Sequence, residues 1–183
     1  MLIGACGPRR AARLARLKGA RLEASLQAQR LCRSLWAELA GRPEADFRIE
    51  EDENGRPFAP EAPGHLSLSH SGSCAAAAVS FRPVGIDLQA IRPISDRVLA
   101  RLCSAEERGW LEEAREEWAA RAIRLWTMKE AYGKMLGTGI FTPPYFHAAF
   151  REGRMLTEYV DARFLFPASP EGYLLSVCLK PGD

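Results

Sequence analysis

The segment from Trp118 to Leu136 constrains the fold of this chain of 183 residues more than any other segment. Apolar residues recur along it at the spacing of an α-helix, and Gly137 and Gly139 follow its last turn. Such a pattern predicts one long helix with a buried apolar stripe, closed by glycine at its C-terminal end. The stripe consists of Leu125, Met128, Tyr132, Met135 and Leu136.

Two further helices are expected upstream of this segment. Between Leu22 and Leu39 the apolar residues again fall at helical spacing, and the pattern ends at Gly41. A shorter helix begins after Ser104, whose hydroxyl suits an N-cap, and places Glu106 and Glu107 in its first turn, where negative charge is favourable.

Short strands account for most of the remaining pattern. Ser71 and Gly72 separate two apolar runs, as a hairpin turn does. Each half of the chain has a long helix and then, after an irregular stretch, a hairpin, which suggests a duplication with its seam near Arg82 and Pro83. The expected strands cover residues 47–51, 65–69, 74–81, 84–88, 145–150, 162–166 and 173–179.

The composition fits a compact domain, since 47% of the residues are hydrophobic and 26% are charged. No apolar run approaches the roughly 18 residues that a membrane-spanning helix needs, so no membrane segment is expected. The five cysteines lie far apart without a CxxC pair, which predicts neither a zinc site nor a disulfide framework and favours the cytoplasm.

Basic residues dominate the start of the chain, where six of them precede the first acidic residue, Glu23. This stretch favours an anionic partner, either nucleic acid or a ligand phosphate, although a solvated segment or a transit peptide gives a similar pattern. The absence of serine before Ser25 argues against a transit peptide. The six residues are Arg9, Arg10, Arg13, Arg16, Lys18 and Arg21.

Three segments carry polar residues that a purely structural element does not need. The hydroxyls and imidazole of residues 69–71 can bind a phosphate, although serine is also ordinary in a hairpin turn. Asp87 ends an apolar strand, as a metal ligand or as a turn cap. Glu130 and Lys134 lie four residues apart on the long helix, outside its apolar stripe, and form either a surface ion pair or part of a site.

In their order and spacing these segments resemble the phosphopantetheinyl transferase superfamily, specifically its long, monomeric Sfp-like branch. The family pattern is Gly-Lys/Arg-Pro, then Ser-His-Ser, then Gly-Ile/Val-Asp, then Trp-x-x-Lys-Glu-Ala-x-x-Lys. The resemblance covers roughly Phe47 to Gly139. The matching residues are Gly55-Arg56-Pro57, Ser69-His70-Ser71, Gly85-Ile86-Asp87 and Trp126 through Lys134.

The resemblance implies an α+β fold of two similar α/β halves related by a pseudo-twofold axis, with coenzyme A in the cleft between them. Residues 1–82 would contact the 3′-phosphate and adenine, and residues 83–183 would hold magnesium and the catalytic residues. The implied reaction transfers 4′-phosphopantetheine from coenzyme A to a serine of an apo acyl or peptidyl carrier protein and releases adenosine 3′,5′-bisphosphate. The implied protein is a cytoplasmic monomer that binds neither nucleic acid nor membrane.

The same resemblance implies a metal site. Asp87 and Glu130 would hold Mg²⁺ together with oxygens of the pyrophosphate. Many relatives have glutamate where this chain has Gln89, whose amide would ligate the metal directly or through water without adding charge. Lys134 would bind the pyrophosphate, and Lys129 would share that role or contact the carrier.

Roles for further residues also follow from the resemblance. Ser69 and His70 would contact the 3′-phosphate end of coenzyme A, while Arg56 and Pro57 would lie beside the adenine. The arginines at 9, 10, 13 and 21 are candidates for the 3′-phosphate, and no spacing selects one of them. The general base would be Glu107, with a one-residue uncertainty from its neighbour at 106 and with a water-mediated role of the metal-site glutamate as the alternative.

Two rival functions remain at this stage. The first is a nucleic-acid-binding module built on the basic N-terminus, although aromatic residues are not interleaved with the arginines as a stacking surface requires. The second is an inactive relative that only binds carrier proteins, against which the intact Asp87, Glu130 and Lys134 argue. The pathway of the carrier, whether fatty acid, polyketide or nonribosomal peptide synthesis, stays open.

Overall fold

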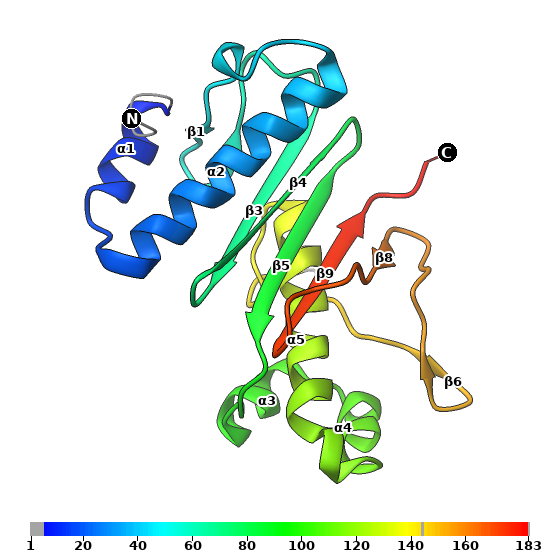
Figure 1. Ribbon diagram of the computed structural model, residues 1–183. Helices are drawn as coiled ribbons and strands as arrows, with labels where there is room; N and C mark the ends of the chain where they lie inside the picture. Colours follow the sequence, from blue (N-terminus) through cyan, green and yellow to red (C-terminus); the bar gives the residue numbers. More distant parts are fainter. Residues whose placement is uncertain (1–5, 144, 183) are drawn as a thin grey trace.

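Helices and strands mix along the whole chain in the computed structural model, which describes residues 6–143 and 145–182 (Figure 1). The fold is α+β, as predicted. The helices are α1 (Pro8–Leu14), α2 (Gly19–Ala40), α3 (Asp96–Leu102), α4 (Ala105–Glu112) and α5 (Trp118–Leu136), with 3₁₀ turns at Glu44–Asp46 and Arg115–Glu117. The strands are β1 (Glu50–Glu51), β2 (Pro57–Phe58), β3 (His65–Ser71), β4 (Cys74–Ser80), β5 (Val84–Ala90), β6 (Phe150–Arg151), β7 (Arg154–Met155), β8 (Arg163–Leu165) and β9 (Tyr173–Leu179).

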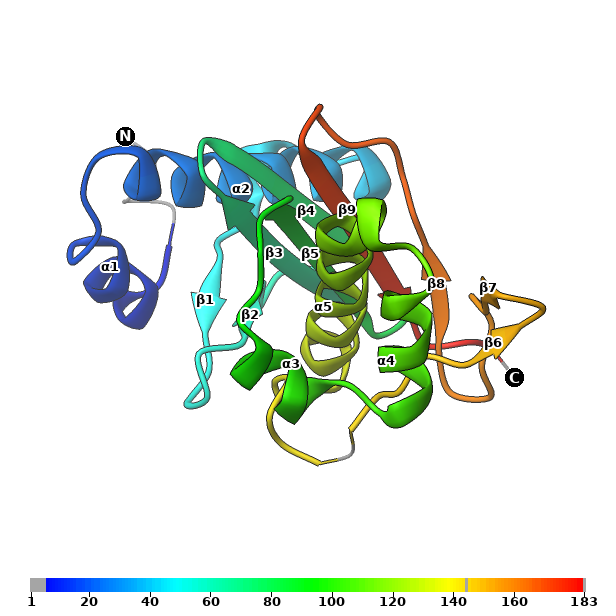
Figure 2. The same cartoon turned by 90° about the horizontal axis from the view of Figure 1, so that it is seen from below.

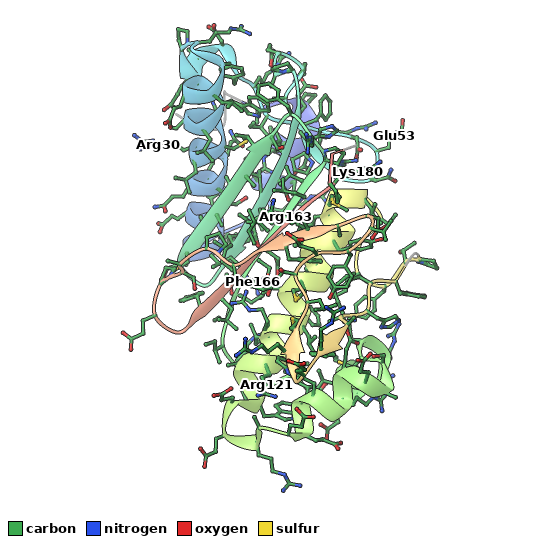
Figure 3. The ribbon with its side chains drawn as sticks, turned by 90° about the vertical axis from the view of Figure 1, so that its right-hand side faces the viewer. Arg30, Glu53, Arg121, Arg163, Phe166 and Lys180 are labelled. Atoms are coloured by element: carbon green, nitrogen blue, oxygen red, sulfur yellow. The ribbon has the colours of Figure 1, made fainter. Side chains whose placement is uncertain are left out.

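Helix α2 covers the antiparallel hairpin of β3 and β4 (Figure 1). Its inner face places Trp36 in a cluster with Phe47, Ile49 and Leu66, all buried. The rings of Trp36 and Phe47 are stacked with their centroids 6.3 Å apart. On the opposite face Arg30 projects away from the strands (Figure 3). The N-terminal part of the chain therefore buries an apolar cluster of its own.

Helix α5 covers the sheet formed by β5, β9 and β8, with α3 and α4 beside it (Figure 2). Its stripe residues Leu125, Met128 and Met135 are buried together with Phe146 and Phe164. Glycine at position 85 allows helix and strand to approach very closely. A Cβ at this position would lie 1.8 Å from the carbonyl oxygen of Ala131 and 2.6 Å from the amide nitrogen of Met135.

Strands β3 and β5 lie side by side without direct backbone pairing between them, since β3 pairs with β4 and β5 pairs with β9 within the described residues. Three serine hydroxyls of β3 instead accept hydrogen bonds from amides of β5. We call Ser67, Ser69 and Ser71 the serine seam. The amide-to-hydroxyl pairs are Ile86 to Ser67 at 3.1 Å, Leu88 to Ser69 at 3.0 Å and Ala90 to Ser71 at 3.1 Å.

Most of the predicted elements are confirmed, including the hairpin and the bounds of the long helix. The N-cap at Ser104 is also confirmed, because its hydroxyl accepts from the amide of Glu107 while the Glu107 carboxylate accepts from the amide of Ser104. Helices α1 and α3 were not predicted. None of the helices in the described ranges combines the length and the apolar character needed to cross a membrane.

The strand predicted at 145–150 is wrong except at its last residue, Phe150. Side chains occupy backbone groups that strand pairing would have used. The amide of Ala148 donates to Glu107, the amide of Ala149 donates to Tyr159, and the carbonyl of Phe146 accepts from Lys129. The segment therefore runs as an irregular strap against α4 and α5.

Candidate active site

Asp87 lies in the middle of β5 and its residue is only 2% exposed. Its Oδ1 accepts hydrogen bonds from the hydroxyl of Ser69 at 2.8 Å and from the ammonium of Lys134 at 2.7 Å. Its Oδ2 accepts from the amide nitrogen of Gln89 at 3.2 Å. A buried carboxylate requires such compensation, and here β3, β5 and α5 each supply part of it.

Glu130 projects from α5 into the same hollow as Asp87. Burial raises the pKa of Glu130 above the ordinary glutamate value, the charge of Asp87 raises it further, and the ammonium of Lys134 opposes both effects. No hydrogen bond to the Glu130 side chain occurs among the described residues. A cation bound beside Glu130 would relieve the effects of burial and of Asp87 that oppose its ionisation.

Lys134 reaches across from α5 to β5. Its ammonium donates to Asp87 and, at 3.0 Å, to the carbonyl of Ile86. Among the described residues Lys134 forms its ion pair with Asp87 and not with Glu130, so the alternative of a surface pair on α5 is wrong. The lysine side chain keeps 30% of its exposure, so it is accessible to a ligand from the hollow.

Gln89, two residues beyond Asp87, presents its amide nitrogen to the aspartate. Its amide oxygen accepts from the hydroxyl of Ser71 at 3.5 Å. To ligate a metal shared with Asp87, this amide would have to exchange the positions of its oxygen and nitrogen. No group of three or more His, Cys, Asp or Glu side chains suited to a metal occurs in the described ranges, so the candidate site offers two carboxylates.

The hollow that contains these side chains has a volume of about 250 Å³. Arg10, Arg13 and His70 also line it. Arg10 is buried and donates to Glu51 at 2.6 Å, and Arg13 shares the same carboxylate at 3.1 Å. Burial lowers the pKa of His70, and the neighbouring cations, beginning with Arg13 and Lys134, lower it further. The same hollow therefore holds both carboxylates and cations.

A second hollow of about 220 Å³ adjoins the first and shares Lys134 and both arginines with it. Gly55 and Arg56, in the turn between β1 and β2, and Pro57 at the start of β2 line it. The guanidinium of Arg56 donates to the carbonyl of Met135 at 3.4 Å and so lies against the C-terminal end of α5. The predicted residues Arg56, Pro57, Ser69 and His70 thus border one continuous space with Asp87, Glu130 and Lys134.

Glu107 and Lys129 lie in a different cluster. Both residues are buried, and the ammonium of Lys129 lies 2.7 Å from the Glu107 carboxylate. Neither residue lines the first two hollows, whereas Lys129 lines a third one of about 170 Å³. Of the two neighbouring glutamates on α4, Glu106 is exposed and Glu107 is buried.

Sequence reasoning missed the residues that hold Arg10 in place. Ser25 and Gln29 on α2 accept from its guanidinium at 3.5 Å and 2.9 Å, and Glu51 forms the ion pair. These partners are buried polar residues on otherwise ordinary elements. Their spacing in the sequence forms no motif, so only the fold brings them together. It is also the fold that places Arg10 and Arg13, out of the basic stretch, at the hollow.

Comparison with known proteins gives a consistent assignment. Residues 83–177 match the family model described as the 4′-phosphopantetheinyl transferase superfamily. The chain is 31% identical over 162 residues to 4′-phosphopantetheinyl transferase ffp of Bacillus subtilis, covering 84% of this chain and 72% of the relative. It is 29% identical over 162 residues to 4′-phosphopantetheinyl transferase Sfp of Bacillus subtilis (strain 168), with the same coverage.

A third relative matches over a shorter stretch. The chain is 38% identical over 112 residues to 4′-phosphopantetheinyl transferase psf-1 of Bacillus pumilus, which is 60% of this chain and 48% of the relative. The match thus spans about half the length of psf-1.

Proposed function

Because the chain belongs to the 4′-phosphopantetheinyl transferase superfamily, and to its Sfp-like branch, we propose that it transfers 4′-phosphopantetheine from coenzyme A to a serine of an apo acyl or peptidyl carrier protein. Adenosine 3′,5′-bisphosphate is the other product. The observation that carries this proposal is the convergence of Asp87, Glu130 and Lys134 in one hollow, which two arginines and a histidine also line.

The charge distribution of the two adjoining hollows fits a ligand with phosphates at separate places. Arg10, Arg13 and His70 would contact the 3′-phosphate, and Lys134 would contact the pyrophosphate. Arg56 and Pro57 border the second hollow, where adenine would lie. Ser69 would act indirectly, because its hydroxyl is engaged by Asp87 and by the amide of Leu88.

The carboxylates of Asp87 and Glu130 fit magnesium. Asp87 and Glu130 would supply hard oxygen ligands, and the raised pKa of Glu130 reflects burial first and then the like charge of Asp87. Magnesium bound there would neutralise charge on the phosphate under attack and on the departing phosphate. Gln89 would complete the ligand set directly or through water.

The protein's own contribution is positioning and fixed charge. Ser69 orients the Asp87 carboxylate from β3, and Lys134 adds a positive charge from α5. A reaction with a loose phosphoryl transition state gains most from such pre-positioned groups. The base that accepts the serine proton is a separate question, since Glu107 and Glu130 belong to different clusters.

The proposal extends to the architecture and setting of the protein. Residues 1–82 and 83–183 would be the two pseudo-twofold halves, with the serine seam between them. Free thiols at Cys32, Cys74, Cys103 and Cys178 are compatible with the reducing cytoplasm. The protein would act as a monomer on its carrier. The nucleic-acid alternative is not favoured, because the family model and the curated relatives are those of 4′-phosphopantetheinyl transferases.

The decisive experiment incubates the protein with coenzyme A, Mg²⁺ and a panel of apo carrier proteins and measures the mass of each carrier. A gain of one phosphopantetheine arm is expected. Asp87→Asn should abolish the gain, whereas the exposed control Asp46→Asn should retain it. No gain on any carrier that an established transferase modifies in parallel would refute the proposed function.

A further inference from the structure

Glu107 is buried where α4, α5 and the strap at 146–148 meet, and four groups surround its carboxylate. Its Oε1 accepts from the ammonium of Lys129 at 2.7 Å and from the amide of Ala148 at 2.7 Å. Its Oε2 accepts from the amide of Ser104 at 2.7 Å and lies 3.4 Å from Nδ1 of His147. This arrangement leaves no space for a substrate hydroxyl to reach the carboxylate directly.

The same surroundings keep Glu107 ionised. Burial opposes ionisation, but the charge and hydrogen bond of Lys129, followed by the amides of Ala148 and Ser104, hold the pKa of Glu107 below the ordinary glutamate value. A carboxylate with a lowered pKa is a poor proton acceptor at neutral pH. It is, however, well suited to orient a neighbouring imidazole, because it only accepts hydrogen bonds.

His147 is placed to use this orientation. Its side chain retains 52% of its exposure while Nδ1 faces the fully buried Glu107. With the Nδ1 proton directed at the carboxylate, Nε2 carries the free lone pair, and no hydrogen bond to Nε2 occurs in the described ranges. A buried carboxylate behind an accessible imidazole is the arrangement by which enzymes activate a hydroxyl nucleophile.

The position of the imidazole relates it to the proposed coenzyme site. His147, Lys129 and the exposed Tyr145 line the third hollow. This hollow shares Gly133 and Gly139 with the second hollow, which in turn contains Lys134. The hollow lined by His147 is therefore a neighbour of the one lined by Lys134, where a pyrophosphate would lie.

We propose that His147 accepts the proton of the attacking serine and that Glu107 positions it, an inference that rests on the proposed transferase function. The serine hydroxyl proton moves to Nε2 as the serine oxygen bonds to the phosphorus that bears pantetheine. The bond from this phosphorus to the oxygen of the leaving adenosine 3′,5′-bisphosphate breaks, and that oxygen keeps the electron pair. The imidazolium then releases its proton to water.

One test needs no coenzyme A. Nitrogen-15 NMR of the histidine side chains distinguishes the two neutral tautomers, and His147→Gln identifies the resonances of this residue. We expect the neutral His147 to carry its proton on Nδ1. A neutral His147 that carries its proton predominantly on Nε2 would overturn the inference, whatever the protein's activity proves to be.

The kinetic test uses His147→Ala at saturating coenzyme A and carrier, with His65→Gln as the matched control. We expect kcat to fall by about 10²-fold or more with little change in KM for the carrier, and added imidazole to restore part of it. His65, at the start of β3, should be dispensable. A kcat within twofold of wild type, or a loss confined to KM, would overturn the role of His147.

A double-mutant cycle separates the dyad from two independent effects. Glu107→Gln keeps the shape of the side chain, and its effect on kcat should largely disappear in the His147→Ala background, since it would act through the imidazole. Full additivity of the two losses would contradict the coupling. Failure of the wild-type protein to modify any carrier would refute the transferase proposal instead. The tautomer measurement would still test the contact between His147 and Glu107.

Discussion

Ser69 donates its hydroxyl proton to Asp87 Oδ1 at 2.8 Å while its oxygen accepts from the amide of Leu88 at 3.0 Å. One side chain of β3 therefore both orients the candidate metal ligand and joins β3 to β5. By its sequence alone the Ser-His-Ser motif was compatible with a phosphate-binding turn. Its first serine has a structural role as well, since it joins the two strands.

Ser69→Ala should accordingly damage stability and metal binding together. The variant leaves the Leu88 amide and one Asp87 lone pair without their buried partner, at a cost of about 1–3 kcal/mol in unfolding free energy. Urea unfolding measures this loss of stability, and magnesium titration measures the loss of metal binding. The exposed turn residue Ser73 supplies the control Ser73→Ala. Equal stability of the two variants would show that the seam contributes nothing at this position.

Lys134→Ala should reduce turnover far more than it reduces stability. Removing a charge aimed at the transition state typically lowers kcat by about 10²–10³-fold. The lysine of the ion pair with Asp87 is partly exposed, but the Asp87 carboxylate is buried, so the melting temperature should fall as well, and magnesium should offset that loss. Lys134→Arg should recover part of the rate. Wild-type kinetics for Lys134→Ala at saturating substrates would exclude a role in catalysis.

Gln89→Glu should strengthen magnesium binding, because it adds a third negative charge beside Asp87. In the absence of the metal the same charge is repelled by the two carboxylates, so the variant should melt at a lower temperature at neutral pH and gain more from magnesium than wild type does. Calorimetric titration and thermal melts measure both effects. Gln27→Glu, on the exposed face of α2, is the control. Unchanged magnesium dependence would show that residue 89 does not face the metal.

Glu130 makes the metal-free protein sensitive to pH. The pKa of Glu130 is raised in the folded state by burial and by Asp87, so the folded protein holds this proton more tightly than the unfolded chain does. Stability should therefore fall as pH rises from the ordinary glutamate value of 4.5 to the raised one, and the loss is complete above it.

Glu130→Gln should remove this pH-dependent loss and raise the melting temperature at pH 7.5 relative to wild type without magnesium, while abolishing transfer. The exposed control Glu38→Gln should do neither. Melting curves between pH 4.5 and pH 8 give the comparison. A wild-type pH profile in the Glu130→Gln variant would refute the assigned cause.

Gly85→Ala should be among the most damaging substitutions available. Its Cβ would lie 1.8 Å from the carbonyl oxygen of Ala131, so α5 would have to move away from β5 and carry Glu130 away from Asp87. A loss of about 3 kcal/mol or more is expected from such overpacking. Gly109→Ala, within α4 and with open space around its Cβ, should instead stabilise by about 0.5–1 kcal/mol.

Local patterns sufficed for much of the fold. The periodicity of Trp118 to Leu136 predicted α5, and the Ser104 cap predicted the start of α4. The strand expected at 145–150 failed because Glu107 and Lys129 bind its backbone, and no local pattern reports a partner so distant in sequence. Helix α1 was missed because its seven residues hold several arginines and no apolar stripe.

In the candidate site, too, local patterns predicted some features and only the fold decides others. The motif order brought Asp87, Glu130 and Lys134 together as a group, and their roles stay predictions to be tested as described above. The sequence could not select Arg10 from the basic stretch, since its buried partners Gln29 and Glu51 lie on other elements. Nor could it separate Glu107 from the metal site, because that separation depends on which way α4 faces.

The serine seam also determines the distance between β3 and β5. Direct pairing would bring β3 and β5 to a spacing of about 4.8 Å, whereas each amide of β5 meets a hydroxyl that stands one methylene out from the β3 backbone. The space between His70 on one strand and Glu130 above the other thereby depends on the length of a serine side chain. A serine position replaced by a longer polar residue would widen that space, and direct backbone pairing would narrow it. Three alternate positions on one strand therefore act as the spacer for the candidate site.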